Sequence, residues 1–135
     1  EAEARRLGVT DRARFLGAQP HDAVARLMAA AEVMVLPTSA EGLANVWVEA
    51  LASGTPVVTS DVGGARDVVD RPEAGRLVPL EPAAIAAAVR DLLAEPPPQE
   101  AVRRAAERFS WEKNAAELRD HLRGLVEVRT ALKAA

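Results

Sequence analysis

The chain contains no cysteine and few aromatic residues. The absence of cysteine among its 135 residues excludes disulfides, thiolate zinc sites and thiol nucleophiles. Aromatic residues make up 3% of the chain and the formal net charge is -3, so we expect neither a base-stacking platform nor a basic surface for nucleic acid. No apolar run reaches the length of a membrane span, and the first residues do not form a secretory signal. We therefore expect a cytoplasmic protein without a nucleic-acid partner, with peripheral contact to a membrane left open.

What the chain does have is the composition of one soluble globular domain. Hydrophobic residues make up 49% and charged residues 27%, and the length suits a single core. The chain begins without methionine inside a predicted helix over residues 1–7, which Gly8 closes. We interpret this start as the sign of a piece of a longer protein.

Apolar runs that alternate with amphipathic stretches predict the fold class. The run EVMVL at residues 32–36, stopped by Pro37, is typical of a parallel strand covered on both faces. Alternation of this kind predicts a doubly wound, Rossmann-like parallel sheet in one α/β domain over residues 1–135. Further strands are predicted at residues 13–17, 56–60 and 76–80, and helices at residues 21–31, 45–53, 66–69, 82–94, 100–109 and 111–132, with prolines 96–98 as a connector between helices.

In such sheets ligands bind at the carboxyl ends of the strands. The loops to consider are residues 17–22, 37–45 and 61–65. The second of these, PTSAEGLAN, leads into a helix with Asn45 as its predicted N-cap. The first N–H groups of that helix lack internal partners and lie at its positive pole, so they can hold a phosphate or diphosphate.

Two glutamates, Glu41 and Glu49, flank this helix start. A helical side chain leans toward the N-terminus, so Glu49 can reach a pocket that Glu41 borders from the loop. Carboxylates accept hydrogen bonds from adjacent sugar or ribose hydroxyls. The alternative is that Glu49 only complements the helix dipole and Glu41 is solvated. The spacing alone favours this alternative, whereas the preceding strand and the Gly63–Gly64 turn that follows favour a ligand site.

The segment FLGAQPHDAVARLMAAAEVMVLPTSAEGLANVWVEALASGTPVVTSDVGGARDVV, followed by EAGRLVPL and FSWEKNAAEL, resembles the carboxyl-terminal domain of the family-4 retaining glycosyltransferases of the GT-B fold. The resemblance covers residues 14–118, and the family's Glu-x7-Glu signature falls on Glu41 and Glu49. It implies transfer of a sugar, with retention, from a UDP- or GDP-sugar to an acceptor hydroxyl, without a metal or cofactor.

The resemblance also implies roles for individual residues. Glu41 would contact the donor sugar beside the reacting centre as the catalytic candidate, and Glu49 would hold the ribose hydroxyls. Backbone N–H groups between them would contact the sugar and diphosphate, and the loop at residues 17–19 would border the base. Gly63 and Gly64 would border the cleft or simply form the turn. The implied donor-binding set is Glu41, Gly42, Leu43, Ala44, Asn45, Val46, Glu49, Gly17, Ala18 and Gln19, with no metal ligand.

By the same resemblance, the amino-terminal acceptor domain and part of this domain's sheet lie outside the chain. We expect the resulting sheet edges to be unpaired, with self-association through them as one outcome, and the chain alone to be inactive. The helices of residues 97–135 would pack toward the missing domain through an apolar side. That side comprises Leu118, Leu122, Leu125, Val126 and Leu132.

The remaining candidates have structural interpretations. His21 and His121 lack partners at metal-ligand spacing and are expected on the surface. Ser110 is the predicted N-cap of the last helix, and Trp111 a packing residue. Three alternatives stay open: a non-catalytic nucleotide-sugar-binding module, a fragment of a GT-B hydrolase or epimerase, and a doubly wound domain of the receiver or flavodoxin type. The chain lacks the acidic pair and the phosphate-loop glycines that the third alternative would require.

Overall fold

The centre of the molecule is a small parallel sheet. The computed structural model describes residues 1–134, and the side chains of residues 1–127 and 129. The three-stranded sheet has the order β1 (Met34–Val35), β2 (Val57–Ser60), β3 (Gly75–Val78), and Val57 lies opposite both Met34 and Gly75. The α-helices of the described part are α1 (Ala2–Arg6), α2 (His21–Ala30), α3 (Asn45–Ala52), α4 (Ala65–Val68), α5 (Pro82–Ala94), α6 (Gln99–Ala106) and α7 (Trp111–Ala134), and η1 (Thr10–Arg12) and η2 (Pro72–Ala74) are 3-10 turns.

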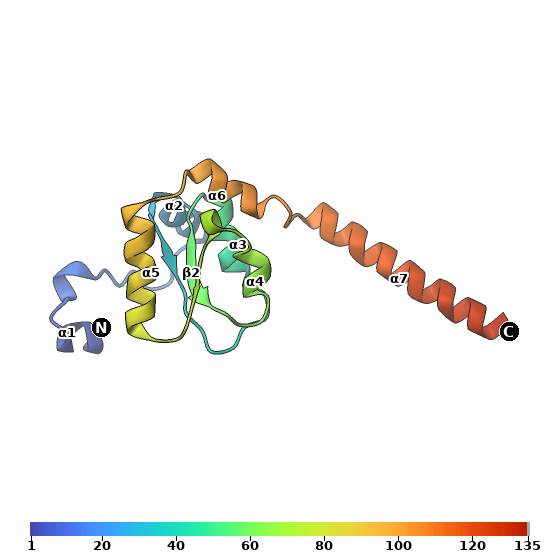
Figure 1. The fold of residues 1–135 in the computed structure, drawn as a ribbon, viewed down its shortest axis with the longest axis horizontal. Helices are drawn as coiled ribbons and strands as arrows, with labels where there is room; N and C mark the ends of the chain where they lie inside the picture. The colour runs from blue at the N-terminus through green and yellow to red at the C-terminus, as the bar shows by residue number, and fades with distance from the viewer. Residues whose placement is uncertain (135) are drawn as a thin grey trace.

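Both faces of β2 are covered, as expected for a doubly wound fold, whereas Val35 of β1 is 44% exposed, so the prediction that the run at residues 32–36 is covered on both faces is wrong. Because side chains alternate along a strand, Val57 faces the cluster built around α3 and α6, and Val58 faces the cluster under α5. All four residues of β2 are buried, and Figure 1 shows α5 and α3 on opposite sides of β2. The strand and helix alternation in the sequence thus correctly predicted the α/β class.

The larger core cluster joins α3 to α6. Trp47 and Leu51 of α3 and Val102 of α6 are all fully buried, and burial of a leucine or valine side chain stabilises the fold by about 1.5–3 kcal/mol. Helix α6 follows the proline connector, as predicted, and packs onto this core. Residues 99–106 are therefore part of the domain's own packing.

The predicted strand at residues 13–17 is absent. These residues form no hydrogen-bonded ladder, and Phe15 and Leu16 are at least half exposed. An apolar run becomes a strand only when a neighbouring strand lies beside it, and here the sheet ends at β1. The helix before this segment does form as α1, and Gly8 closes it with φ 66°.

Helix α7 projects away from the rest of the molecule (Figure 1). Trp111, the predicted packing residue, is 83% exposed, and Leu118, Leu122 and Leu125 are more than half exposed. The prediction for Trp111 is therefore wrong within this chain, because no described element covers the start of α7. The side chain of Leu132 lies outside the described residues. Among the described helices, none is long and apolar enough to cross a membrane.

Candidate functional site

The loop between β1 and α3 is fastened to the end of β2. The backbone N–H of Thr38 donates a hydrogen bond to Ser60 Oγ at 2.8 Å, and the Ser60 hydroxyl donates to the Thr38 carbonyl. Because β1 and β2 are parallel neighbours, their carboxyl ends meet at one edge of the sheet. The loop that carries Glu41 therefore starts at the edge where ligands bind in folds of this class.

The Gly63–Gly64 turn supports the same loop further along. The Gly64 N–H donates to the Gly42 carbonyl at 2.7 Å. Gly63 has φ 49°, and a Cβ at this position would collide with the carbonyl oxygens of Glu41 and Gly42. The two glycines thus form the turn and let it pack tightly under the loop. Contact between these glycines and a ligand stays a prediction.

The start of α3 differs in one respect from the prediction. Its N-cap is Ala44, with φ -73° and ψ 117°, and Asn45 is the first helical residue, so the predicted N-cap role of Asn45 is wrong. The reason is that the chain already turns into the helix at the extended Ala44. Glu49 consequently lies in the second turn of α3, with its side chain 44% exposed.

A cavity of about 660 Å³ opens beside α3. Three predicted donor-binding residues, Leu43, Asn45 and Glu49, line it together. Ala44 and Val46 contact the core instead, so only their backbone could serve a ligand. The full lining is Leu43, Asn45, Val48, Glu49, Asp67, Arg108, Phe109, Ser110, Trp111, Lys113, Asn114 and Glu117.

Glu41 is placed differently from Glu49. It is exposed, its Oε1 atom accepts a hydrogen bond from the Gly42 N–H at 3.2 Å, and it does not line this cavity. The structure therefore brings Glu49, Asn45 and Leu43 to one cavity, and Glu41 and Gly42 to the adjoining Gly63–Gly64 turn.

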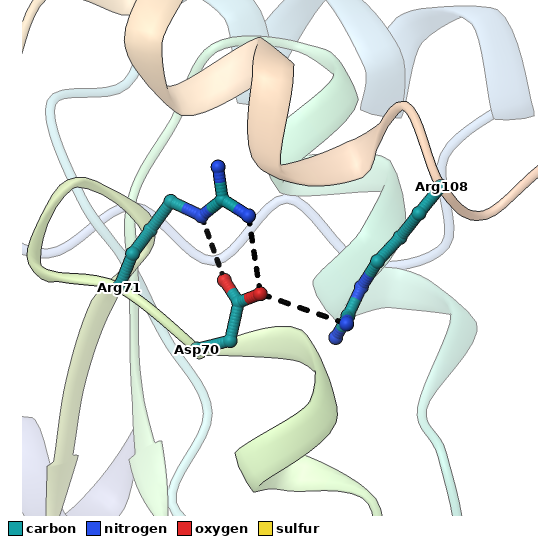
Figure 2. A network of polar contacts seen from close by, with 3 residues as sticks. All are labelled: Asp70, Arg71 and Arg108. Atoms are coloured by element: carbon teal, nitrogen blue, oxygen red, sulfur yellow. Dashed lines mark hydrogen bonds and ion pairs between the residues drawn. The ribbon is translucent and has the colours of Figure 1, made fainter.

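Part of the cavity lining comes from the connector between α6 and α7, which sequence reasoning did not assign to a site. Figure 2 shows how this part is held: Asp70 accepts hydrogen bonds from Arg71 at 2.8 and 3.1 Å, and Arg108 Nη1 lies 3.6 Å from Asp70 Oδ2. The hydrogen-bonded Arg71 guanidinium lowers the pKa of Asp70. The Arg108 guanidinium also lies over the Phe109 ring, 4.7 Å from its centroid. Ser110 caps α7 as predicted, since its Oγ accepts the Lys113 N–H at 3.2 Å.

The charges around the cavity are mixed. Its acidic residues are Glu49, Asp67 and Glu117, and its basic residues are Arg108 and Lys113. Arg108 is already paired with Asp70, and Lys113 Nζ donates to the Glu107 carbonyl at 3.3 Å. Within residues 1–134, no group of three or more acidic or histidine side chains could hold a metal ion. The cavity thus has no excess of positive charge for a diphosphate beyond the helix N-terminus.

His21, which follows the loop at residues 17–19 in the chain, lies near Glu49. The His21 Nε2 atom is 3.8 Å from Glu49 Oε1. Gln19 folds back within the loop, its Nε2 donating to the Leu16 carbonyl at 2.5 Å. His21 is 85% exposed, in line with its predicted surface position, but its proximity to Glu49 was not predicted. Nothing in the local sequence indicates it, because the two residues lie on different helices.

Fold and site together define an α/β domain of the doubly wound, Rossmann-like class, with its candidate site at the carboxyl edge of the sheet. The family described as "Glycosyl transferases group 1" matches residues 1–124, and the chain belongs to that family. It is 39% identical over 132 residues to a D-inositol 3-phosphate glycosyltransferase of Segniliparus rotundus. The matched region covers 91% of this chain and 29% of that protein.

Solved structures agree with this assignment. Sucrose-phosphate synthase from Thermosynechococcus elongatus matches with a TM-score of 0.75 and 31% identity, over 94% of this chain and 33% of its own. AviGT4, a glycosyltransferase involved in avilamycin A biosynthesis, matches with a TM-score of 0.65 and 28% identity, over 98% of this chain and 40% of its own. The fold is that of GT-B glycosyltransferases, and the chain spans 29% to 40% of the length of these proteins.

Proposed function

We propose that the chain is the donor-binding part of a family-4 retaining glycosyltransferase, corresponding to most of its carboxyl-terminal domain. The observation that carries this proposal is the meeting of Leu43, Asn45 and Glu49 around one cavity at the start of α3. The ligand would be a nucleoside-diphosphate sugar, with UDP or GDP as the nucleotide. The acceptor would be a hydroxyl group bound mainly by another domain.

Each part of the site has a distinct task in this proposal. Glu49 accepts hydrogen bonds from the ribose hydroxyls, and Glu41 contacts the sugar from the neighbouring loop. The backbone N–H groups at the start of α3 face the diphosphate, on which negative charge grows as the glycosidic bond breaks. A helix N-terminus stabilises such charge without a metal ion. We propose that no metal or cofactor takes part.

The mixed charge of the cavity favours a second candidate function. Because Arg108 and Lys113 already have partners, the cavity by itself could hold a nucleotide-sugar without activating it. The chain would then act as a non-catalytic binding module. A GT-B hydrolase or epimerase would use the same donor site, and the acceptor domain would distinguish it.

The same proposal gives expectations for the location of the protein and for its partners. We place the protein in the cytoplasm, with a peripheral membrane position as the alternative. The amino-terminal acceptor domain would cover the exposed face of α7. The outer edges of β1 and β3, which have no neighbouring strand in the described sheet, would offer the chain a route to self-association.

Titration of the chain with UDP, GDP and their sugar conjugates tests the donor site. Glu49→Gln removes the charge but keeps the shape, so we expect the Kd for the preferred nucleotide to rise at least about 10-fold, as for the loss of a charged hydrogen bond. Isothermal calorimetry measures this change. Glu95→Gln, at the exposed end of α5, is the matched control and should leave the Kd unchanged. Equal affinity of the Glu49→Gln variant and the unaltered chain would exclude the ribose role of Glu49.

A further inference from the structure

His21 of α2 faces Glu49 of α3, whose carboxylate lines the cavity. Among the described residues, this is the one pairing of an imidazole with a carboxylate between these two helices. The His21 Nε2 and Glu49 Oε1 atoms are 3.8 Å apart. This distance allows electrostatic attraction when the imidazole is protonated, but it is longer than a hydrogen bond. A small movement of either side chain would therefore close the pair when a ligand settles against Glu49.

The acidic residue next to His21 in the sequence already has another partner. Asp22, the next residue of α2, is engaged by Arg26, whose Nη1 lies 2.8 Å from Asp22 Oδ2. The acidic group that the structure pairs with His21 is Glu49. His21 also comes directly after the loop that contains Gly17 and Gln19. The pair thus links two separate segments, to each of which the family resemblance gives a role in binding the nucleotide.

We propose that His21 is a positioning residue for Glu49, and that the pair recognises the 2′ and 3′ hydroxyls of the ribose of a nucleoside diphosphate. This inference rests on the proposed donor-binding function. The imidazole holds Oε1, which leaves Oε2 and the free lone pairs of the carboxylate to accept hydrogen bonds from the two hydroxyls. His21 itself need not touch the nucleotide.

The need for such a partner follows from the mobility of the glutamate side chain. Glu49 is 44% exposed on its side chain, and a free glutamate loses rotamer freedom when a ligand orders it. A partner that restricts the carboxylate before binding reduces this loss. The effect must depend on the ribose hydroxyls, because they are the groups that Glu49 contacts.

The experiment compares UDP and GDP with their 2′,3′-dideoxy analogues, titrated against the unaltered chain and its variants. For the nucleotide that binds, His21→Ala should raise the Kd by up to about 5-fold, the upper end of the range for an exposed ion pair. The same variant should leave the Kd of the dideoxy analogue unchanged. His21→Gln, which keeps an N–H donor, should recover part of the affinity. In the Glu49→Gln background, His21→Ala should have no further effect.

His121 on α7 provides the matched control. It is also an exposed histidine but does not line the cavity, so His121→Ala should leave all affinities unchanged. In NMR spectra, the Cε1–H signal of His21 should move on addition of the nucleotide and that of His121 should not. Circular dichroism should show that each variant keeps the helical content of the unaltered chain.

The possible outcomes separate the two proposals. Two results would overturn the role of His21 alone. In the first, His21→Ala weakens binding of the nucleotide and of its dideoxy analogue equally. In the second, His21→Ala leaves the affinity unchanged while Glu49→Gln still lowers it. Unchanged affinity in Glu49→Gln would remove the ribose role of Glu49 and with it that of His21. A chain that binds neither UDP nor GDP would refute the donor-binding function itself.

Discussion

At Gly63, a single added methyl group would displace the loop that carries Glu41. The new Cβ would collide with the backbone carbonyls of Glu41 and Gly42, and backbone atoms cannot move aside as the end of a side chain can. We expect Gly63→Ala to lower the free energy of unfolding by about 1–3 kcal/mol and to weaken binding of a nucleotide-sugar more than that of the free nucleotide. Urea unfolding and calorimetry measure the two effects.

The matched control for this substitution is Gly8→Ala. Gly8 has a similar φ, 66°, but nothing lies within 4 Å of the position that its Cβ would take. This variant therefore carries only the cost of a left-handed alanine, about 1 kcal/mol, and should leave ligand affinity unchanged. Equal behaviour of the two variants would mean that the backbone angle, and not the support of the loop, explains the glycine at position 63.

At the scale of elements, the ion pair between Arg108 and Asp70 joins the connector between α6 and α7 to the turn after α4, where Arg71 also binds Asp70 (Figure 2). The hydrogen bond from Arg71 lowers the pKa of Asp70. A lowered carboxyl pKa stabilises the folded state above the ordinary pKa, and this stabilisation is lost as the pH falls through the lowered pKa. Because the carboxylate is 25% exposed, solvent reduces the effect.

We therefore expect Asp70→Asn to lower the free energy of unfolding by at most about 1 kcal/mol at pH 7. The difference from the unaltered chain should disappear in acid, where Asp70 is protonated in both states. Urea unfolding at pH values from 7 down to about 2 gives this profile. Asp11→Asn, an exposed residue of η1, should show no such difference. A constant deficit at all pH values would indicate lost packing in place of a lost charge.

Local signals predicted some elements well and others not at all. Pro82 at the first position and the apolar spacing that follows gave α5 its observed bounds, Pro82–Ala94, because both signals act within one helix. The segment at residues 13–17 has an equally apolar sequence, but a strand depends on a neighbour that the local sequence does not describe. The same limit applies to Trp111, whose burial depends on an element outside its own helix.

In the candidate site, too, residues that are close in the sequence could be grouped in advance, whereas residues from distant segments could not. Leu43, Asn45 and Glu49 lie within one loop and helix, and all three line one cavity, while their contact with a donor stays a prediction. Arg108, Phe109 and Trp111 reach the same cavity from a distant segment, and sequence spacing contains no sign of that approach. The contact between His21 and Glu49 was missed for the same physical reason.

At the scale of the whole molecule, we expect the chain alone to bind a donor without transferring its sugar. The basic residues of the cavity already have partners, and the chain spans 29% of the D-inositol 3-phosphate glycosyltransferase that it resembles. Incubation with UDP- and GDP-sugars and simple hydroxyl acceptors, followed by mass spectrometry, should show no product. Calorimetric binding in the same preparation confirms that the sample is competent. Any transfer product would contradict this expectation.

The loop of residues 37–44 is tied to the end of β2 at Thr38 and to the glycine turn at Gly42. Its conformational entropy, about 1 kcal/mol or more for each residue, is therefore lost when the chain folds and not when a ligand arrives. A nucleotide that binds beside this loop does not have to wait for the loop to close. Association rates should therefore be similar for different nucleotides. Selectivity among them would then arise from how long each one stays bound.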